Sequence, residues 1–234
     1  MILVTAKRRS RLAIVLILAV SLLLGAIVAW PVAPSWRSPL DVPQLSALRE
    51  VRKQGLDLPD DRTNQVLPLR IGGHKWVAQD LLPKQGKEPA ALLVRPQADP
   101  KDKPYVDWSD LNGFFDWQQD AVQTLTVSLP ESKSPVIARW FIARDPQDTQ
   151  VVHFPQRVAV AQWYAFREGG HPTVFQWFWR DQLAQLRGSR EPWVAVSVRL
   201  PVKPDITLEE TAETMTELVQ VVQGTISEML ELEE

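Results

Sequence analysis

The chain has 234 residues, of which 45% are hydrophobic and 23% charged, a balance typical of a folded globular protein. It contains no cysteine, which excludes disulfides, cysteine-ligated zinc, iron–sulfur clusters and thiol catalysis. Four of the 26 basic residues lie at 7–11, so the rest of the chain carries 22 basic against 28 acidic residues. Such an acidic body lacks the basic face that a nucleic-acid backbone requires, and we expect no nucleic-acid partner.

The first element is an uncharged apolar run at 12–30, LAIVLILAVSLLLGAIVAW. As a helix it would be about 28 Å long, close to the ~30 Å hydrocarbon core of a bilayer. Basic residues precede it, and Trp30 at its end and Trp36 after it lie where the far interface would be. We therefore expect a cytoplasmic N-terminus at 1–11, a single-pass transmembrane anchor at 12–30 and an exported, periplasmic or equivalent, remainder. A cleaved signal peptide is the alternative, although the run is longer than a usual signal-peptide core.

Residues 31–41 hold three prolines and predict a stiff spacer, after which 42–234 should form one exported domain. A short helix is expected to start at a cap on Asp41 and to end at Gly55. Strands are expected at 69–71 and 75–80 around the turn Gly72-Gly73, at 90–95, and then at 121–129, 136–144, 150–154 and 157–167.

The strand predicted at 157–167 has apolar side chains on both faces, which indicates a central strand covered on both sides. A helix at 174–187 and a strand at 192–200 follow. A long C-terminal helix should begin at the capping-box pair Thr207 and Glu210. Its apolar stripe is Leu208, Met215, Leu218, Val219, Val222, Ile226 and Met229. The predicted fold class is α+β, with a mainly antiparallel sheet, packed helices and the N-terminal transmembrane helix.

No catalytic, cofactor or metal motif is present in the sequence. The histidines His74, His153 and His171 match no metal-ligand spacing. Neither a G-x-S-x-G serine motif nor a glycine-rich phosphate loop occurs. We therefore assign no catalytic residue, cofactor or metal.

One group of carboxylates lies among aromatic side chains at 105–120, and its members are Asp107, Asp110, Asp116 and Asp120. Acids beside aromatic rings occur in carbohydrate-processing and calcium sites. An envelope hydrolase that uses Asp107–Asp120 is therefore one alternative function. Capping and turn chemistry is the structural alternative, because the spacing matches no EF-hand loop.

Three segments resemble one protein family: VAVAQWYAFREGG at 158–170, FQWFWRDQLAQLRGSREPWVAVSVRLP at 175–201, and the acidic end of the C-terminal helix. With the N-terminal anchor, they make the chain similar to the cyanobacterial cyanoexosortase system-associated proteins, of the type B associated group. The resemblance implies a non-enzymatic, single-pass membrane accessory protein. Its implied partners are the lipid bilayer and an exosortase, the integral-membrane enzyme that processes PEP-CTERM-type sorting signals.

Helical spacing divides 175–187 into two faces. We expect the wider apolar face to be the core face, formed by Phe175, Phe178, Trp179, Gln182, Leu183 and Leu186. Trp177, Arg180 and Asp181 lie on the opposite face and are a candidate docking surface for a membrane partner, since Trp and Arg are favoured anchors. Alternatively, a loop or the C-terminal helix covers Trp177. A glycan- or lipid-binding envelope module that uses the tryptophans is a further alternative function.

The turn after this helix carries three residues to which we assign structural roles. Gly188 should occupy the C-cap of the helix. Arg190 should pair with Asp181 or cap the last carbonyls of the helix. Trp193 should be buried where the next strand begins.

Overall fold

The computed structural model describes residues 40–59, 65–82, 89–105, 107–130, 132, 134–144 and 157–231. The segments expected at 1–11 and 12–30, nearly all of the spacer, and the expected strand 150–154 with His153 lie outside the described residues. Within the described ranges, no helix is both long enough and apolar enough to cross a membrane.

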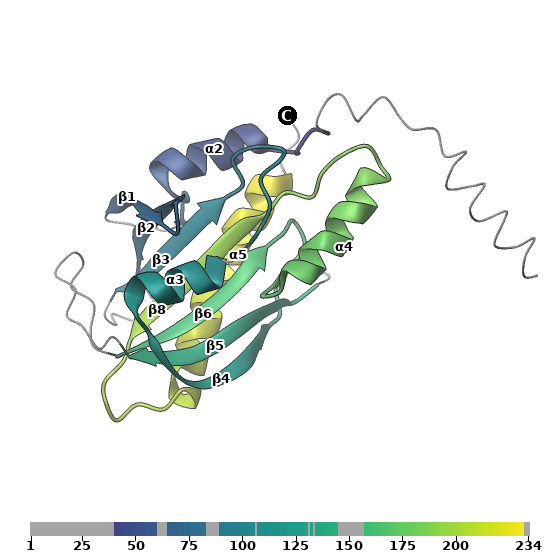
Figure 1. Ribbon diagram of the computed structural model, residues 1–234. Coiled ribbons are helices and arrows are strands. Elements are labelled where there is room, and N and C mark those ends of the chain that lie inside the picture. Colours follow the sequence, from purple (N-terminus) through teal and green to yellow (C-terminus); the bar gives the residue numbers. More distant parts are fainter. Residues whose placement is uncertain are drawn as a thin grey trace, which may run out of the picture. The chain divides into compact units, whose positions relative to one another are not determined.

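Eight strands form one sheet in the order β1-β2-β3-β8-β6-β7-β5-β4 (Figure 1). All neighbouring strands pair antiparallel except the short contact between β5 and β7. The strands are β1 Val66–Ile71, β2 His74–Leu81, β3 Ala90–Pro96, β4 Gln118–Val127, β5 Val136–Arg144, β6 Arg157–Ala165, β7 Gly170–His171 and β8 Val194–Pro201.

The helices are α2 Leu45–Gln54, α3 Asp107–Phe115, α4 Val174–Gln185 and α5 Ala212–Glu231, with a short 3-10 turn, η3 Glu209–Thr211. Helices α2 and α5 pack on one face of the sheet, and their apolar residues join one core with alternate residues of the strands. Helices α3 and α4 contribute to a second core on the opposite face. Figure 1 shows α3 in front of the sheet and α5 behind it. The predicted α+β class, with a mainly antiparallel sheet and a long C-terminal helix, is confirmed.

The first face of the sheet is almost purely apolar. The α5 side chains Leu218, Val222 and Ile226 are fully buried against it, so the predicted stripe is confirmed. A buried polar group crosses between α5 and the sheet: the Trp163 indole donates to the Gln223 side-chain oxygen at 2.9 Å, and the Gln223 amide donates to the Phe166 carbonyl at 2.9 Å.

The capping box before α5 forms as predicted. The backbone N–H of Thr207 donates to the Glu210 carboxylate at 2.8 Å, and the N–H of Glu210 faces the Thr207 hydroxyl at 3.4 Å. The cap expected on Asp41 is wrong. Helix α2 instead starts after Gln44, which adopts a left-handed backbone with φ 57°, and the carbonyl of Asp41 accepts the backbone N–H of Arg190.

Strand β6 is buried along nearly its whole length and lies between β8 and β5, so the predicted central strand is confirmed. The segment 105–120, which shows no clear period in the sequence, contains α3. This helix packs Leu111 and Phe115 into the second core, where Tyr164 and Trp193 also lie. The second core is therefore built largely from aromatic side chains.

Candidate functional site

Helix α4 has one apolar face that is directed toward solvent. We call the side chains Phe175, Phe178, Trp179, Leu183 and Leu186 the outer face, and they are between 44% and 68% exposed. The aromatic rings contact one another, with the Phe175 and Phe178 centroids 6.0 and 5.6 Å from that of Trp179. The outer face is therefore a contiguous aromatic and aliphatic surface.

The inner face of α4 packs through Trp177 and Asp181, which are 3% and 2% exposed. The Trp177 indole donates to the backbone carbonyl of Glu191 at 3.3 Å. The Asp181 carboxylate accepts two hydrogen bonds from the Arg190 guanidinium, at 2.7 and 2.9 Å, and one from the Glu191 N–H at 3.1 Å. A two-point guanidinium–carboxylate bond fixes both the position and the rotation of the helix.

This arrangement corrects the predicted orientation of the helix. The two faces are as the spacing divides them, but the face expected in the core is exposed and the face carrying Trp177 and Asp181 is buried. The loop after α4 covers Trp177, as the alternative interpretation predicted. Arg180 is half-buried, with its guanidinium 4.9 Å from the Phe166 ring centroid.

Arg190 also joins α4 to two other segments of the chain. Its guanidinium donates to the carbonyl of Pro100 at 2.7 Å, and its backbone N–H donates to the carbonyl of Asp41 at 2.9 Å. The predicted pair with Asp181 is confirmed. Because Asp41 is the second described residue, the chain enters this domain directly beside the C-terminal end of α4.

The C-cap position predicted for Gly188 is wrong: α4 ends at Gln185, and Leu186 is its C-cap. Gly188 lies two residues further on, in the turn, with φ 82°, a left-handed value at which a side chain is strained, and its N–H donates to the Gln185 carbonyl at 3.0 Å. The N–H of Ser189 donates to the Ala184 carbonyl at 3.1 Å. Trp193 is fully buried, as expected.

The acidic and aromatic segment places one carboxylate in the interior. Asp107 opens α3 and is fully buried. It accepts a hydrogen bond from Arg95 at 2.7 Å and one from the Tyr164 hydroxyl at 2.9 Å. Burial raises its pKa to about 6, while the positive charge of Arg95 acts in the opposite direction. The side chain is thus committed to internal contacts.

The other three carboxylates of this segment do not join Asp107 in one constellation. Asp110 packs against the turn at Gly72, where an added Cβ would lie 2.1 Å from the Asp110 carboxyl carbon. Asp116 is the residue with φ 47° that ends α3, and Asp120 forms an exposed ion pair with Arg144 at 2.6 Å. These carboxylates serve in turns and in an ion pair, which agrees with the structural interpretation of the segment more than with a hydrolase site.

Two buried arginines on the second face, Arg95 and Arg199, were not predicted from the sequence. Arg95 pairs with Asp107 and Asp102, and its guanidinium lies 4.7 Å from the Trp193 ring centroid. Arg199 is 1% exposed, and its guanidinium lies 3.7 and 4.8 Å from the ring centroids of Phe115 and Trp117. The two rings form an aromatic cage around it. Burial lowers the pKa of Arg199 well below the ordinary value. An arginine inside an otherwise apolar predicted strand was the signal available in the sequence.

The described histidines have local roles. The ring of His74 lies 3.3 Å from the Arg95 guanidinium, and burial with that positive charge lowers its pKa. His171 Nδ1 accepts the backbone N–H of Thr173 at 3.2 Å, at the start of α4. No group of three or more His, Asp or Glu that could hold a metal occurs in the described part of the chain.

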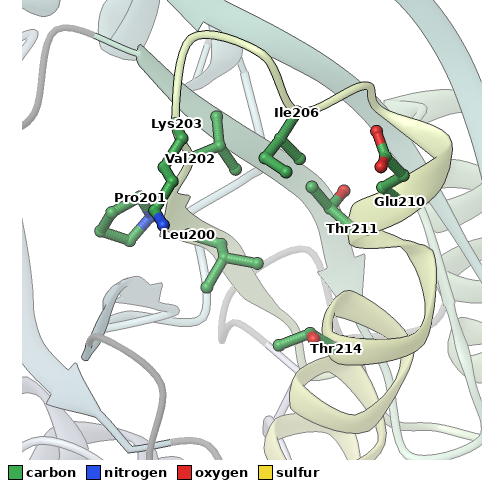
Figure 2. Close-up of a pocket in the computed structure, with 8 residues that line it drawn as sticks. All are labelled: Leu200, Pro201, Val202, Lys203, Ile206, Glu210, Thr211 and Thr214. Carbon is green, nitrogen blue, oxygen red and sulfur yellow. The ribbon is translucent and has the colours of Figure 1, made fainter.

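A pocket of about 470 Å³ lies between the end of β8 and the start of α5. Figure 2 shows Leu200, Val202 and Ile206 on one side and Thr211 and Glu210 on the other. The Glu210 carboxylate already accepts the hydroxyl and N–H of Thr207. The pocket therefore has an apolar wall, and Lys203 also lines it.

Comparisons of the chain with models of protein families, with curated proteins and with solved structures find no match. A function must therefore be argued from the chain's own residues and their chemistry.

Proposed function

We propose that this chain is a non-enzymatic, single-pass membrane accessory protein of an exosortase-type protein-sorting system, with its domain on the exported side. The similarity of residues 158–170 and 175–201 to cyanoexosortase system-associated proteins supports the proposal, as does the apolar run at 12–30 with the basic residues before it. On this proposal the domain works by binding, and the chemistry belongs to the membrane enzyme.

The observation that carries the proposal is the outer face of α4 and its position. Five large apolar side chains are exposed on one helix, beside the point where Asp41 brings the chain into the domain. Monomeric soluble proteins rarely expose such a contiguous patch unless it binds something. On this proposal, a surface near the point where the chain enters the domain is suited to a partner in or on the membrane.

The described carboxylates favour this proposal over the hydrolase alternative. A general acid or nucleophile must reach its substrate. Asp107, the first residue of α3, is buried with Arg95 and Tyr164 as its hydrogen-bond partners. Burial in the fold therefore accounts for its raised pKa.

The proposal is tested in cells that contain the exosortase and a protein with its sorting signal. Deleting the chain should lower processing of that signal, and Leu183→Glu should do the same because it places a charge on the outer face. Val122→Glu is the matched control, since Val122 is similarly exposed but lies on β4. Unchanged processing in the deletion strain would refute the accessory role, whatever the behaviour of α4.

A further inference from the structure

The outer face of α4 lies close to where the chain leaves the domain toward its N-terminus. The backbone bond between Arg190 and Asp41 and the Arg190–Asp181 pair place Asp41 near the C-terminal end of α4. Ten residues, 31–40, separate Asp41 from the apolar run that ends at Trp30. Fully extended, they span at most about 36 Å. A bilayer that holds 12–30 is therefore within reach of α4.

The composition of the outer face suits the boundary of a bilayer. Trp179 contacts two phenylalanines, and Leu183 and Leu186 extend the surface toward the end of the helix. Interfacial helices combine an apolar face of Trp, Phe and Leu with basic residues along its edge. Tryptophan in particular favours the headgroup level, where its ring is apolar and its N–H is hydrated.

Three arginines lie around the outer face. Arg180 lies on α4, and Arg187 lies in the turn that follows it. Arg167 precedes the start of α4 in the chain. Asp181, the acid of α4, is buried and bound by Arg190.

Two acids remain nearby in the chain. Glu168 is exposed, whereas Glu191 is largely buried, which raises its pKa. Asp41, whose carbonyl accepts the Arg190 N–H, is also exposed. Arg167, Arg180 and Arg187 are the basic side chains that a surface of anionic lipid would attract.

We propose that α4 is an interfacial helix whose outer face inserts into the headgroup layer of an anionic bilayer. The proposal rests on the membrane tether of the proposed function, and it adds a second point of membrane attachment. Because Arg190 and Asp181 fix the rotation of α4, insertion also fixes the orientation of the whole sheet relative to the membrane plane.

The absence of cysteine makes a site-specific test direct. Leu183→Cys in the full-length chain is labelled with an environment-sensitive fluorophore and reconstituted, without any other protein, into vesicles of phosphatidylglycerol and phosphatidylcholine. Val122→Cys is the matched control on β4. We expect the label at 183 to shift to the blue and to be quenched by nitroxide lipids several-fold more than the label at 122. Vesicles of phosphatidylcholine alone should give a weaker response.

Three outcomes would overturn the proposal. Equal quenching at 183 and 122 would mean that α4 has no preferred contact with lipid. No blue shift at 183 in either kind of vesicle would exclude insertion. A shift at 183 that requires exosortase in the same vesicle would make the outer face a protein-binding surface, and the proposed accessory function would then stand without the lipid contact.

Discussion

The two faces of the sheet are built on different principles. The face under α2 and α5 is a largely apolar core, in which Gln223 bonds across to the sheet. The face under α3 and α4 buries two arginines, two aspartates and a tyrosine hydroxyl among aromatic rings. An apolar core tolerates apolar substitutions that conserve volume, whereas buried ions require every partner in place. The second face should therefore respond to charge and pH where the first responds to volume.

The largest effect is expected from Arg95→Met, which leaves the Asp107 carboxylate buried without its cation. Removing one partner of a buried pair typically costs about 3–5 kcal/mol. Denaturant unfolding at pH 7 measures the loss. The control is Arg144→Met at an exposed pair, where we expect less than about 1 kcal/mol. Equal losses in the two variants would contradict the comparison.

On the first face, Leu218→Ala should reduce the free energy of unfolding by about 2–5 kcal/mol, because Leu218 is fully buried and its shortened side chain leaves a cavity. The same change at Leu183, on the exposed outer face, should stay within about 0.5 kcal/mol. The loss at Leu218 should not depend on pH. A loss that varies with pH would show that charges also govern this face.

A smaller effect is expected from Arg190→Lys, which keeps the charge but removes the two-point bond to Asp181. A single ammonium cannot reproduce the guanidinium fork. We expect a loss of about 1–2 kcal/mol, together with faster hydrogen exchange in α4 than in α5. Uniformly faster exchange in both helices would argue against a local role in holding α4.

A further effect concerns pH. The pKa of Asp107 is raised from its ordinary 3.8 to about 6, so between these values the folded chain holds a proton that the unfolded chain has lost. This contribution is fully present below pH 3.8 and is lost as the pH rises through 6, with a slope of at most about 1.4 kcal/mol per pH unit. The difference in unfolding free energy between the wild-type chain and Asp107→Asn isolates it. A difference that does not change between the acidic and the neutral end of this window would contradict the prediction.

Much of the fold could be predicted where one simple pattern decides the structure. The stripe of α5, the capping box at Thr207 and Glu210, and the strands β2, β5 and β6 each follow from periodicity or from a local hydrogen bond. Helix α3 could not be predicted, because its nine residues include Gly113 and show no apolar period. Its position depends on the buried ion pair that its first residue, Asp107, forms with Arg95 on β3.

The orientation of α4 shows why the candidate site was harder to predict. Spacing divides a helix into faces but does not say which face is inside, and the larger apolar face is the usual choice. Here the predicted pair of Asp181 with Arg190 indicates which face of α4 is buried. Arg190 lies just before a buried strand, so a helix that pairs with it must turn Asp181 and Trp177 inward. The remaining apolar face then points outward.

Gln223 has a mechanical consequence for the C-terminal helix. Its side chain bonds to both the indole of Trp163 and the carbonyl of Phe166, two groups near the end of one long strand. Sliding α5 by even one residue, about 1.5 Å along its axis, would strand these polar atoms in a dry interface. Gln223 therefore fixes the register of α5 on the sheet. A force applied at either end of the domain is then transmitted through helix and sheet together, without α5 sliding.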